Sequence, residues 1–313
     1  MPEEKKSYVS FFLLLGVAAL MLGAIVLREP QMQSQPLWPQ GAPGAVADTA
    51  EDKPSLRVFL PPVYNNSGTA VVICPGGGYR ILTIGYEGEA IARWFNTIGV
   101  AAFVLEYRHA PSYQHPTPLQ DALRAMRYVR YHAKDYRIEP GLIGIMGFSA
   151  GGHLASSVST HYNEATLNPS DPVDGVSSRP DFTVLGYPII SLLPPVTHEG
   201  TALNLMGNQD TPELRTAYSN HLHVTSQTPP AFLFHTLEDE AVPAENSILY
   251  YKALVAAHVP AEMHLYEKGK HGAGLADGRD GAPHIPTLTT WPDLLMRWLA
   301  GRGFLGRSNT AAP

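Results

Sequence analysis

The chain has 313 residues, of which 44% are hydrophobic and 16% charged, enough for one large globular domain of the α/β kind or for two small ones. Its formal net charge of -6 argues against a nucleic-acid groove, which requires a basic stripe. A single cysteine, Cys74, excludes an internal disulfide, and its place at the end of an apolar run indicates a buried strand residue.

A nearly unbroken apolar run extends from Val9 to Leu27. A helix of this length reaches about 28 Å, enough to cross a hydrocarbon core, so residues 1–28 are expected to be a targeting element. A cleaved signal peptide and an uncleaved anchor are both open, and the anchor fits the length better because the nearest A-x-A lies at residues 45–47. Either version predicts export to the periplasmic or extracellular side, with membrane contact only through residues 9–27.

Residues 29–52 are rich in Pro, Gln, Gly and Ala and show little periodicity, which predicts a linker with an entry loop. Folding is expected to begin near Lys53. The predicted catalytic domain extends over residues 53–305, and residues 306–313 are a short tail.

Apolar runs and helical patterns alternate along this domain. Strands are predicted at Leu56–Leu60, Thr69–Cys74, Val100–Glu106, Ile143–Met146, Phe182–Tyr187, Ala231–His235 and Ala261–Tyr266. Helices are predicted at Glu87–Ile98, Pro118–Tyr136, from Gly152 onward, at Ala244–His258 and at Trp291–Leu299. This order predicts a mostly parallel sheet with helices on both faces. Between Ile190 and Pro230 no long periodic run occurs, which predicts an irregular insertion over the sheet's edge that shapes a substrate pocket.

The stretch Gly147–Gly151 has the pattern G-x-S-x-G of a nucleophile elbow. A serine on so sharp a strand-to-helix turn lies in strained backbone with its hydroxyl pushed out of the sheet, and the small flanking residues let strand and helix approach. The pattern therefore predicts Ser149 as a nucleophile. The alternative is a glycine-rich turn with a serine at a helix start.

A serine nucleophile needs a histidine base and an acid that fixes the histidine's tautomer, each in a loop just after a strand. Past the strand that ends at His235, three carboxylates compete: Glu238, Asp239 and Glu240. The alternative is that all three only crowd a helix N-terminus, where negative charge is stabilised by about 0.3–1 kcal/mol.

His271 lies between glycines in the loop after the last predicted strand, and this place in the chain order predicts that it is the base. The other histidines fit less well. His264 lies inside a strand, His235 ends one, and His153 lies on the helix after the elbow.

Three glycines, Gly76–Gly78, follow the strand that ends at Cys74. Backbone without side chains lets several N–H groups point at one spot, as an oxyanion hole requires, and the N–H of Ala150 would add a further donor. A phosphate-binding loop is the competing interpretation, but no G-K-[ST] follows the glycines.

With these motifs in order, the chain resembles the α/β-hydrolase carbohydrate esterases, specifically their acetyl-xylan-esterase-like branch, which is related to feruloyl-esterase-like and hormone-sensitive-lipase-like hydrolases. The resemblance covers about Leu37 to Trp298. It is carried by Leu37-Trp38-Pro39, Gly41–Gly44, Pro75–Tyr79, Tyr107–Pro111, Gly147–His153, His235–Ser247 and Gly269–Gly272.

The resemblance implies an α/β-hydrolase fold with Ser149 as nucleophile, Asp239 as acid through its D-x-x-V-P spacing, and His271 as base. It also implies Gly77, Gly78 and Ala150 as oxyanion donors. Pro75 stands where the lipase-like relatives carry histidine, and Glu238 before Asp239 departs from the commoner Asp-Asp pair, which keeps Glu238 open as the acid.

The expected function is that of a serine carboxylesterase that removes acetyl or other short acyl groups, on plant polysaccharide fragments, through an acyl-enzyme. Tyr79, Tyr187 and the segment from Ile190 to Pro230 are expected to shape the substrate pocket. Neither a metal nor another cofactor is expected, because the histidines lack ligand spacing. The alternatives are a peptidase or arylformamidase on the same scaffold, and a non-catalytic hydrolase-fold binding protein.

Overall fold

The computed structural model describes residues 33–164 and 171–306. Its strands are β1 (Gln33–Pro36), β2 (Ser55–Phe59), β3 (Ala70–Cys74), β4 (Ala101–Glu106), β5 (Ile143–Phe148), β6 (Thr183–Gly186), β7 (Ala231–Thr236) and β8 (Ala261–Tyr266). Its α-helices are α2 (Ala90–Thr97), α3 (Thr117–Tyr131), α4 (Ser149–His161), α5 (Glu199–Met206), α6 (Pro212–Ala217), α7 (Glu245–Ala256) and α8 (Trp291–Gly301). A π-helical turn, Gly85–Glu89, leads directly into α2.

The strands form one eight-stranded sheet in the order β1-β2-β4-β3-β5-β6-β7-β8. β2 pairs antiparallel with β4, and every pair from β4 to β8 is parallel. Parallel strands end at one edge of the sheet, so the loops that follow β3, β5, β7 and β8 all open at that edge.

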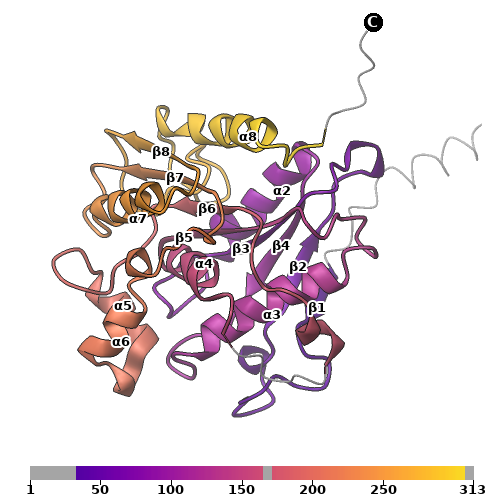
Figure 1. The fold of residues 1–313 in the computed structure, drawn as a ribbon, viewed down its shortest axis with the longest axis horizontal. Coiled ribbons are helices and arrows are strands. Elements are labelled where there is room, and N and C mark those ends of the chain that lie inside the picture. The colour runs from indigo at the N-terminus through magenta and orange to yellow at the C-terminus, as the bar shows by residue number, and fades with distance from the viewer. Residues whose placement is uncertain (1–32, 165–170, 307–313) are drawn as a thin grey trace, which may run out of the picture. The chain divides into compact units, whose positions relative to one another are not determined.

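Side chains of the central strands alternate between two cores, because successive residues of a strand point to opposite faces. On β3, Val72 packs with α3, α4 and α7, whereas its neighbours Val71 and Ile73 pack with α2 and α8. Figure 1 shows α2 and α8 on one side of the sheet and α3 and α4 on the other. The prediction of a mostly parallel sheet flanked by helices is confirmed.

The predicted linker 29–52 is wrong for its second part, because folded structure begins before Lys53. Strand β1 joins the sheet, a short 3-10 helix spans Ala50–Asp52, and Leu37 is fully buried. The Pro- and Gly-rich composition hid these elements, since a strand of only four residues carries almost no periodic signal.

The segment from Ile190 to Pro230 is more regular than predicted, since it contains α5 and α6, which lie together at the lower left of Figure 1. Both helices are at most eight residues long. Isolated helices of that length are not stable by themselves, so their pattern in the sequence is weak and packing against the rest of the chain decides their conformation.

The apolar run from Val9 to Leu27, the predicted targeting segment, lies outside the described residues. Among residues 33–164 and 171–306, no helix combines the length and hydropathy needed to span a bilayer.

Candidate active site

Ser149 is the first residue of α4 and follows directly on β5. Its φ of 52° lies in the left-handed region, where a residue with a Cβ is strained. The flanking glycines make this turn possible, because a Cβ on Gly147 would lie 2.0 Å from the carbonyl oxygen of Gly151, and a Cβ on Gly151 would lie 2.0 Å from that of Cys74. The predicted elbow is therefore present, with strand, helix and the end of β3 in direct backbone contact.

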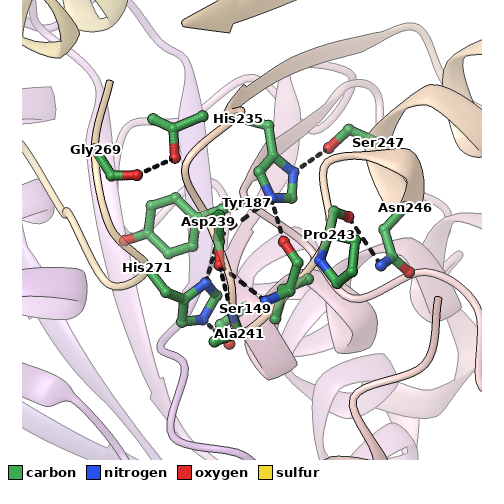
Figure 2. A network of polar contacts seen from close by, with 12 residues as sticks. Ser149, Tyr187, His235, Asp239, Ala241, Pro243, Asn246, Ser247, Gly269 and His271 are labelled. Carbon is green, nitrogen blue, oxygen red and sulfur yellow. Dashed lines mark hydrogen bonds and ion pairs between the residues drawn. The ribbon is translucent and has the colours of Figure 1, made fainter. Parts of the chain in front are cut away.

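Ser149, His271 and Asp239 meet at the carboxyl edge of the sheet (Figure 2). The Oγ of Ser149 lies 2.7 Å from Nε2 of His271, and Nδ1 of His271 lies 2.6 Å from Oδ2 of Asp239. Since a carboxylate only accepts, Nδ1 carries the proton and Nε2 is left to accept the hydroxyl hydrogen of Ser149. The imidazole thus has the tautomer that a general base for serine requires.

The Asp239 side chain is fully buried, and donors surround both of its oxygens. Oδ1 accepts the backbone N–H groups of Val242 at 2.8 Å and Ala241 at 3.1 Å, while Oδ2 accepts His271 and lies 3.3 Å from Nε2 of His235. Burial by itself raises the pKa of Asp239, but these hydrogen bonds outweigh it and hold the pKa well below its usual range. Asp239 is therefore ionised at neutral pH.

His235, which the sequence suggested only as the end of a strand, supports Asp239. Its Nε2–H donates to the carbonyl of Val242 at 2.9 Å besides facing Asp239, and its Nδ1 accepts the hydroxyl of Ser247 at 2.8 Å (Figure 2). The ring is completely buried. A histidine four residues before the acid of a D-x-x-V-P loop is the sequence signal that could have identified this contact.

Glu238, the alternative acid, is directed elsewhere. Its carboxylate accepts Nζ of Lys268 at 2.8 Å and the backbone N–H of Gly269 at 3.1 Å, on an exposed part of the loop. The choice between two adjacent carboxylates is thus made by the turn after β7, which points Asp239 inward and Glu238 outward.

The glycine loop, residues 76–78, lies against the nucleophile: a Cβ on Gly76 would be 3.1 Å from Cβ of Ser149. Gly77 and Gly78 have φ of 124° and 65°, a conformation that glycine adopts without strain. Within the described part of the chain, no hydrogen bond uses the N–H of either residue. Ala150, in the first turn of α4, likewise has no intrahelical acceptor. These N–H groups remain available, and their role as oxyanion donors stays a prediction.

The prediction that Tyr79 lines the substrate pocket is wrong. Its side chain is 1% exposed, and its hydroxyl donates to Nδ1 of His153 at 2.9 Å, beneath the glycine loop. Tyr187 is buried as well, with its hydroxyl on Glu87 and its ring 5.1 Å from that of His271. Both tyrosines support the site instead of facing a ligand, since each is buried and has its hydroxyl bonded to a buried partner.

Two half-buried side chains that the sequence did not single out flank the site. The hydroxyl of Tyr86 lies 3.4 Å from where a Cβ on Gly272, next to His271, would be, and burial and the adjacent Glu87 raise its pKa to about 12. On the other side His198 caps α5 and bonds Thr201, which lies 3.6 Å from the Cβ position of Gly78. No spacing pattern connects these residues to Ser149. In the part of the chain that the structure describes, no group of His, Cys, Asp or Glu is arranged to hold a metal ion.

A mostly parallel sheet with a serine, a histidine and an aspartate joined by hydrogen bonds at its carboxyl edge defines an α/β hydrolase of the serine type. The model of the BD-FAE family matches residues 56–254 of the chain, including the serine and the aspartate. The chain belongs to this family.

The relatives carry related names. The chain is 38% identical over 228 residues to an acetylxylan esterase of Xylanibacter ruminicola, covering 72% of this chain and 44% of that protein. It is 36% identical over 210 residues to an endo-1,4-beta-xylanase B of Butyrivibrio fibrisolvens, covering 66% of this chain and 33% of that protein. The chain therefore spans less than half the length of these curated relatives.

A solved structure matches over its whole length. It is an acetyl ester-xyloside bifunctional hydrolase from Caldicellulosiruptor lactoaceticus, with a TM-score of 0.80 and 40% identity, covering 90% of this chain and 100% of that one. The carboxylesterase Cest-2923 from Lactobacillus plantarum superposes with a TM-score of 0.71 and 25% identity, covering 88% of this chain and 99% of that one.

Proposed function

We propose that this protein is a serine carboxylesterase that removes acetyl or other short acyl groups from its substrate. The observation that carries the proposal is the continuous line of hydrogen bonds from Ser149 through His271 to the ionised Asp239. Serine is unreactive at its ordinary pKa and becomes a nucleophile only next to a correctly oriented base.

The reaction follows from these contacts. As Oγ of Ser149 attacks the ester carbonyl, its proton passes to Nε2 of His271, and Asp239 stabilises the imidazolium that forms. The carbonyl oxygen becomes an oxyanion, which the N–H groups of the glycine loop and Ala150 bind. Collapse of the tetrahedral intermediate expels the alcohol, which takes the proton from His271 and leaves an acyl-serine. Water, deprotonated by the same imidazole, then releases the acid and restores Ser149.

For the natural substrate we infer an acetyl ester on xylan or a similar plant polysaccharide. The names of the relatives support this choice, since one is an acetylxylan esterase and another an acetyl ester-xyloside hydrolase. The latter matches 90% of this chain with all of its own length, which adds support to the choice.

The first experiment measures nitrophenol release from p-nitrophenyl acetate. The wild type should give a burst equal to the enzyme concentration, or steady turnover if acylation is slow, and Ser149→Ala should lose turnover by about 10⁵–10⁶-fold while keeping its circular dichroism spectrum. Ser177→Ala, an exposed serine, is the control and should retain full activity. Undiminished turnover in Ser149→Ala would exclude the proposal.

The second experiment compares aryl esters of increasing acyl length and then measures acetate release from acetylated xylan. Preference for acetyl together with acetate release supports the proposed substrate. Amide or formamide turnover well above ester turnover would instead favour a peptidase or arylformamidase on the same scaffold.

We further propose that the catalytic domain acts outside the cytoplasm. The support is the apolar run from Val9 to Leu27, which has the length of a signal anchor. A protease-protection experiment tests this. Protease is added outside the inner membrane, and an antibody against the catalytic domain then shows whether that domain has been digested, as an exported domain should be. Protection of the whole protein together with a cytoplasmic marker would contradict it.

A further inference from the structure

Glu87 is a buried carboxylate that the proposed reaction does not use. It is 2% exposed and lies in the π-helical turn Gly85–Glu89, a conformation that is rare and concentrated at functional sites. No Lys or Arg among the described residues forms an ion pair with it. A buried charge without a cation is costly, so its hydrogen bonds must compensate.

Three donors converge on the two oxygens of Glu87. Oε2 accepts the backbone N–H of Gly76 at 2.9 Å and the hydroxyl of Thr83, while Oε1 accepts the hydroxyl of Tyr187 at 2.8 Å. The phenol oxygen itself accepts the N–H of Gly274 at 2.8 Å, so its own hydrogen is directed to Glu87. Both oxygens of Glu87 therefore only accept hydrogen bonds, which fits an ionised carboxylate and not a protonated acid.

One oxygen of Glu87 fixes the glycine loop. A Cβ on Gly76 would lie 2.6 Å from Oε2 of Glu87 and 3.1 Å from Cβ of Ser149, so the loop lies tightly between the carboxylate and the nucleophile. With the N–H of Gly76 engaged, the next two peptide groups are the ones that remain to face a substrate oxygen.

The other oxygen reaches the His271 loop, residues 267–274. Tyr187 bonds Glu87, receives the N–H of Gly274, and packs edge-on against the ring of His271 at 5.1 Å between centroids. A single carboxylate thus connects the loop expected to bind the oxyanion with the loop that carries the base.

We propose that Glu87 is a positioning residue that holds the glycine loop and the His271 loop in fixed relation, and that its negative charge favours the protonated His271 formed during the reaction. This inference rests on the proposed esterase function. The charge attracts the imidazolium through a water-poor interior, where electrostatic interactions are stronger than at the surface.

The groups that face this pair do not compete with it near neutral pH. Around His271 these are Asp239, which stays ionised, and His198, whose pKa burial lowers. Around Glu87 they are three tyrosines, Tyr86, Tyr107 and Tyr187, whose pKa values burial raises. On balance burial raises the pKa of Glu87 above its usual value, although its three hydrogen bonds and the charge on His271 act in the other direction. The three donors that converge on its oxygens still fit the carboxylate form.

The test compares Glu87→Gln with Glu106→Gln in the full-length protein. Glu106 on β4 is a partly buried carboxylate bonded to Arg57 and Ser55. Its replacement removes the same negative charge as Glu87→Gln, but at a place away from the triad. For Glu87→Gln, kcat on p-nitrophenyl acetate should fall by about 10–100-fold, less than the ~10²–10³-fold loss of an oxyanion donor, with KM changed much less. The acid limb of the curve of kcat/KM against pH should move to lower pH by at least about half a unit, because His271 loses a nearby negative charge that favours its protonated form. Glu106→Gln should leave kcat and the acid limb unchanged.

Glu87→Asp separates the two roles, because it restores the charge but is too short to reach both Gly76 and Tyr187. Its acid limb should return to that of the wild type while kcat stays low. A wild-type kcat and acid limb in Glu87→Gln would overturn the proposal. Titration with phenylmethylsulfonyl fluoride counts the enzyme molecules with a reactive Ser149. If a smaller number of these molecules explains the whole loss of kcat and the acid limb does not move, the proposal is also overturned.

An NMR titration of the His271 ring gives a readout that needs no substrate. In Glu87→Gln the ring should lose its proton at lower pH than in the wild type, whatever substrate the protein uses. If Glu87→Gln shows this shift but the wild type shows no Ser149-dependent turnover, the esterase function is rejected and the effect of Glu87 on His271 stands. The absence of the shift in an active enzyme would reject the inference about Glu87 alone.

Discussion

Histidines in two regions of this molecule have opposite surroundings. In the triad, His271 bonds the ionised Asp239 and the hydroxyl of Ser149, with its side chain 22% exposed. In the histidine cluster, His115, His153, His161 and His223 gather around Tyr218, the residue that follows α6. There, within the described residues, none of these four rings bonds a carboxylate.

The contrast is clearest at His153. Its Nε2–H donates to the carbonyl of Tyr218 at 2.9 Å, and its Nδ1 accepts the hydroxyl of Tyr79. Burial lowers its pKa to about 4, although the bond to Tyr218 acts in the other direction. His153 therefore stays neutral in a saturated set of hydrogen bonds, whereas His271 faces a carboxylate that can stabilise its positive charge. Burial together with the hydrogen-bond partners decides which histidine can act as a base.

The strongest way to break this contrast is Asp239→Asn, which removes the charge beside His271. An amide can donate to Nδ1 and hold the ring in the wrong tautomer, so kcat/KM on p-nitrophenyl acetate should fall by about 10⁴-fold. Glu238→Gln, one residue away and bonded to Lys268, should change kcat/KM by less than about threefold. Equal losses in the two variants would mean that Glu238 shares the role of the acid.

A smaller effect is expected from Tyr79→Phe, which removes the link between the glycine loop and the histidine cluster. Nδ1 of the buried His153 would lose its donor, so the free energy of unfolding should fall by about 1–3 kcal/mol in urea titrations. The relative rates on acetate, propionate and butyrate esters should stay the same because Tyr79 does not face the substrate. Tyr131→Phe, on the exposed surface, is the control and should leave stability unchanged. A changed acyl preference with normal stability would return Tyr79 to the pocket.

An effect of similar size on stability is expected from pH. The folded pKa of His153, about 4, lies below the value near 6.5 expected in the unfolded chain, so between these two pH values the unfolded state binds more protons. The stability linked to His153 should be fully present above pH 6.5 and fall by roughly 1–3 kcal/mol as the pH drops to 4. His153→Gln should flatten this part of the curve of unfolding free energy against pH.

The control for this titration is His264→Gln, which makes the same change at a partly exposed histidine on β8 that bonds Glu262. It should keep the slope of the wild type. An unchanged slope in His153→Gln would show that other groups cause the acid sensitivity, and the neutral state assigned to His153 would be wrong.

The sequence by itself determined the features that depend on neighbouring residues and on chain order. The apolar runs predicted the central strands, and the glycines around Ser149 predicted the elbow, because steric limits on the backbone act between residues close in the chain. The position of His271 after the last strand was sufficient to find it. In a parallel sheet, loops that follow successive strands meet at one edge whatever their detailed conformation.

Only the tertiary structure decided what depends on contacts between distant segments. Ser149 and His271 are 122 residues apart, and Tyr187 and Glu87 are 100 apart. Asp239 prevails over Glu238 because one turn points it inward. Tyr79 is a support and not a pocket wall because its ring is buried and its hydroxyl bonds His153. The direction of a side chain is set by its packing in three dimensions, and no pattern within a single segment carries that information.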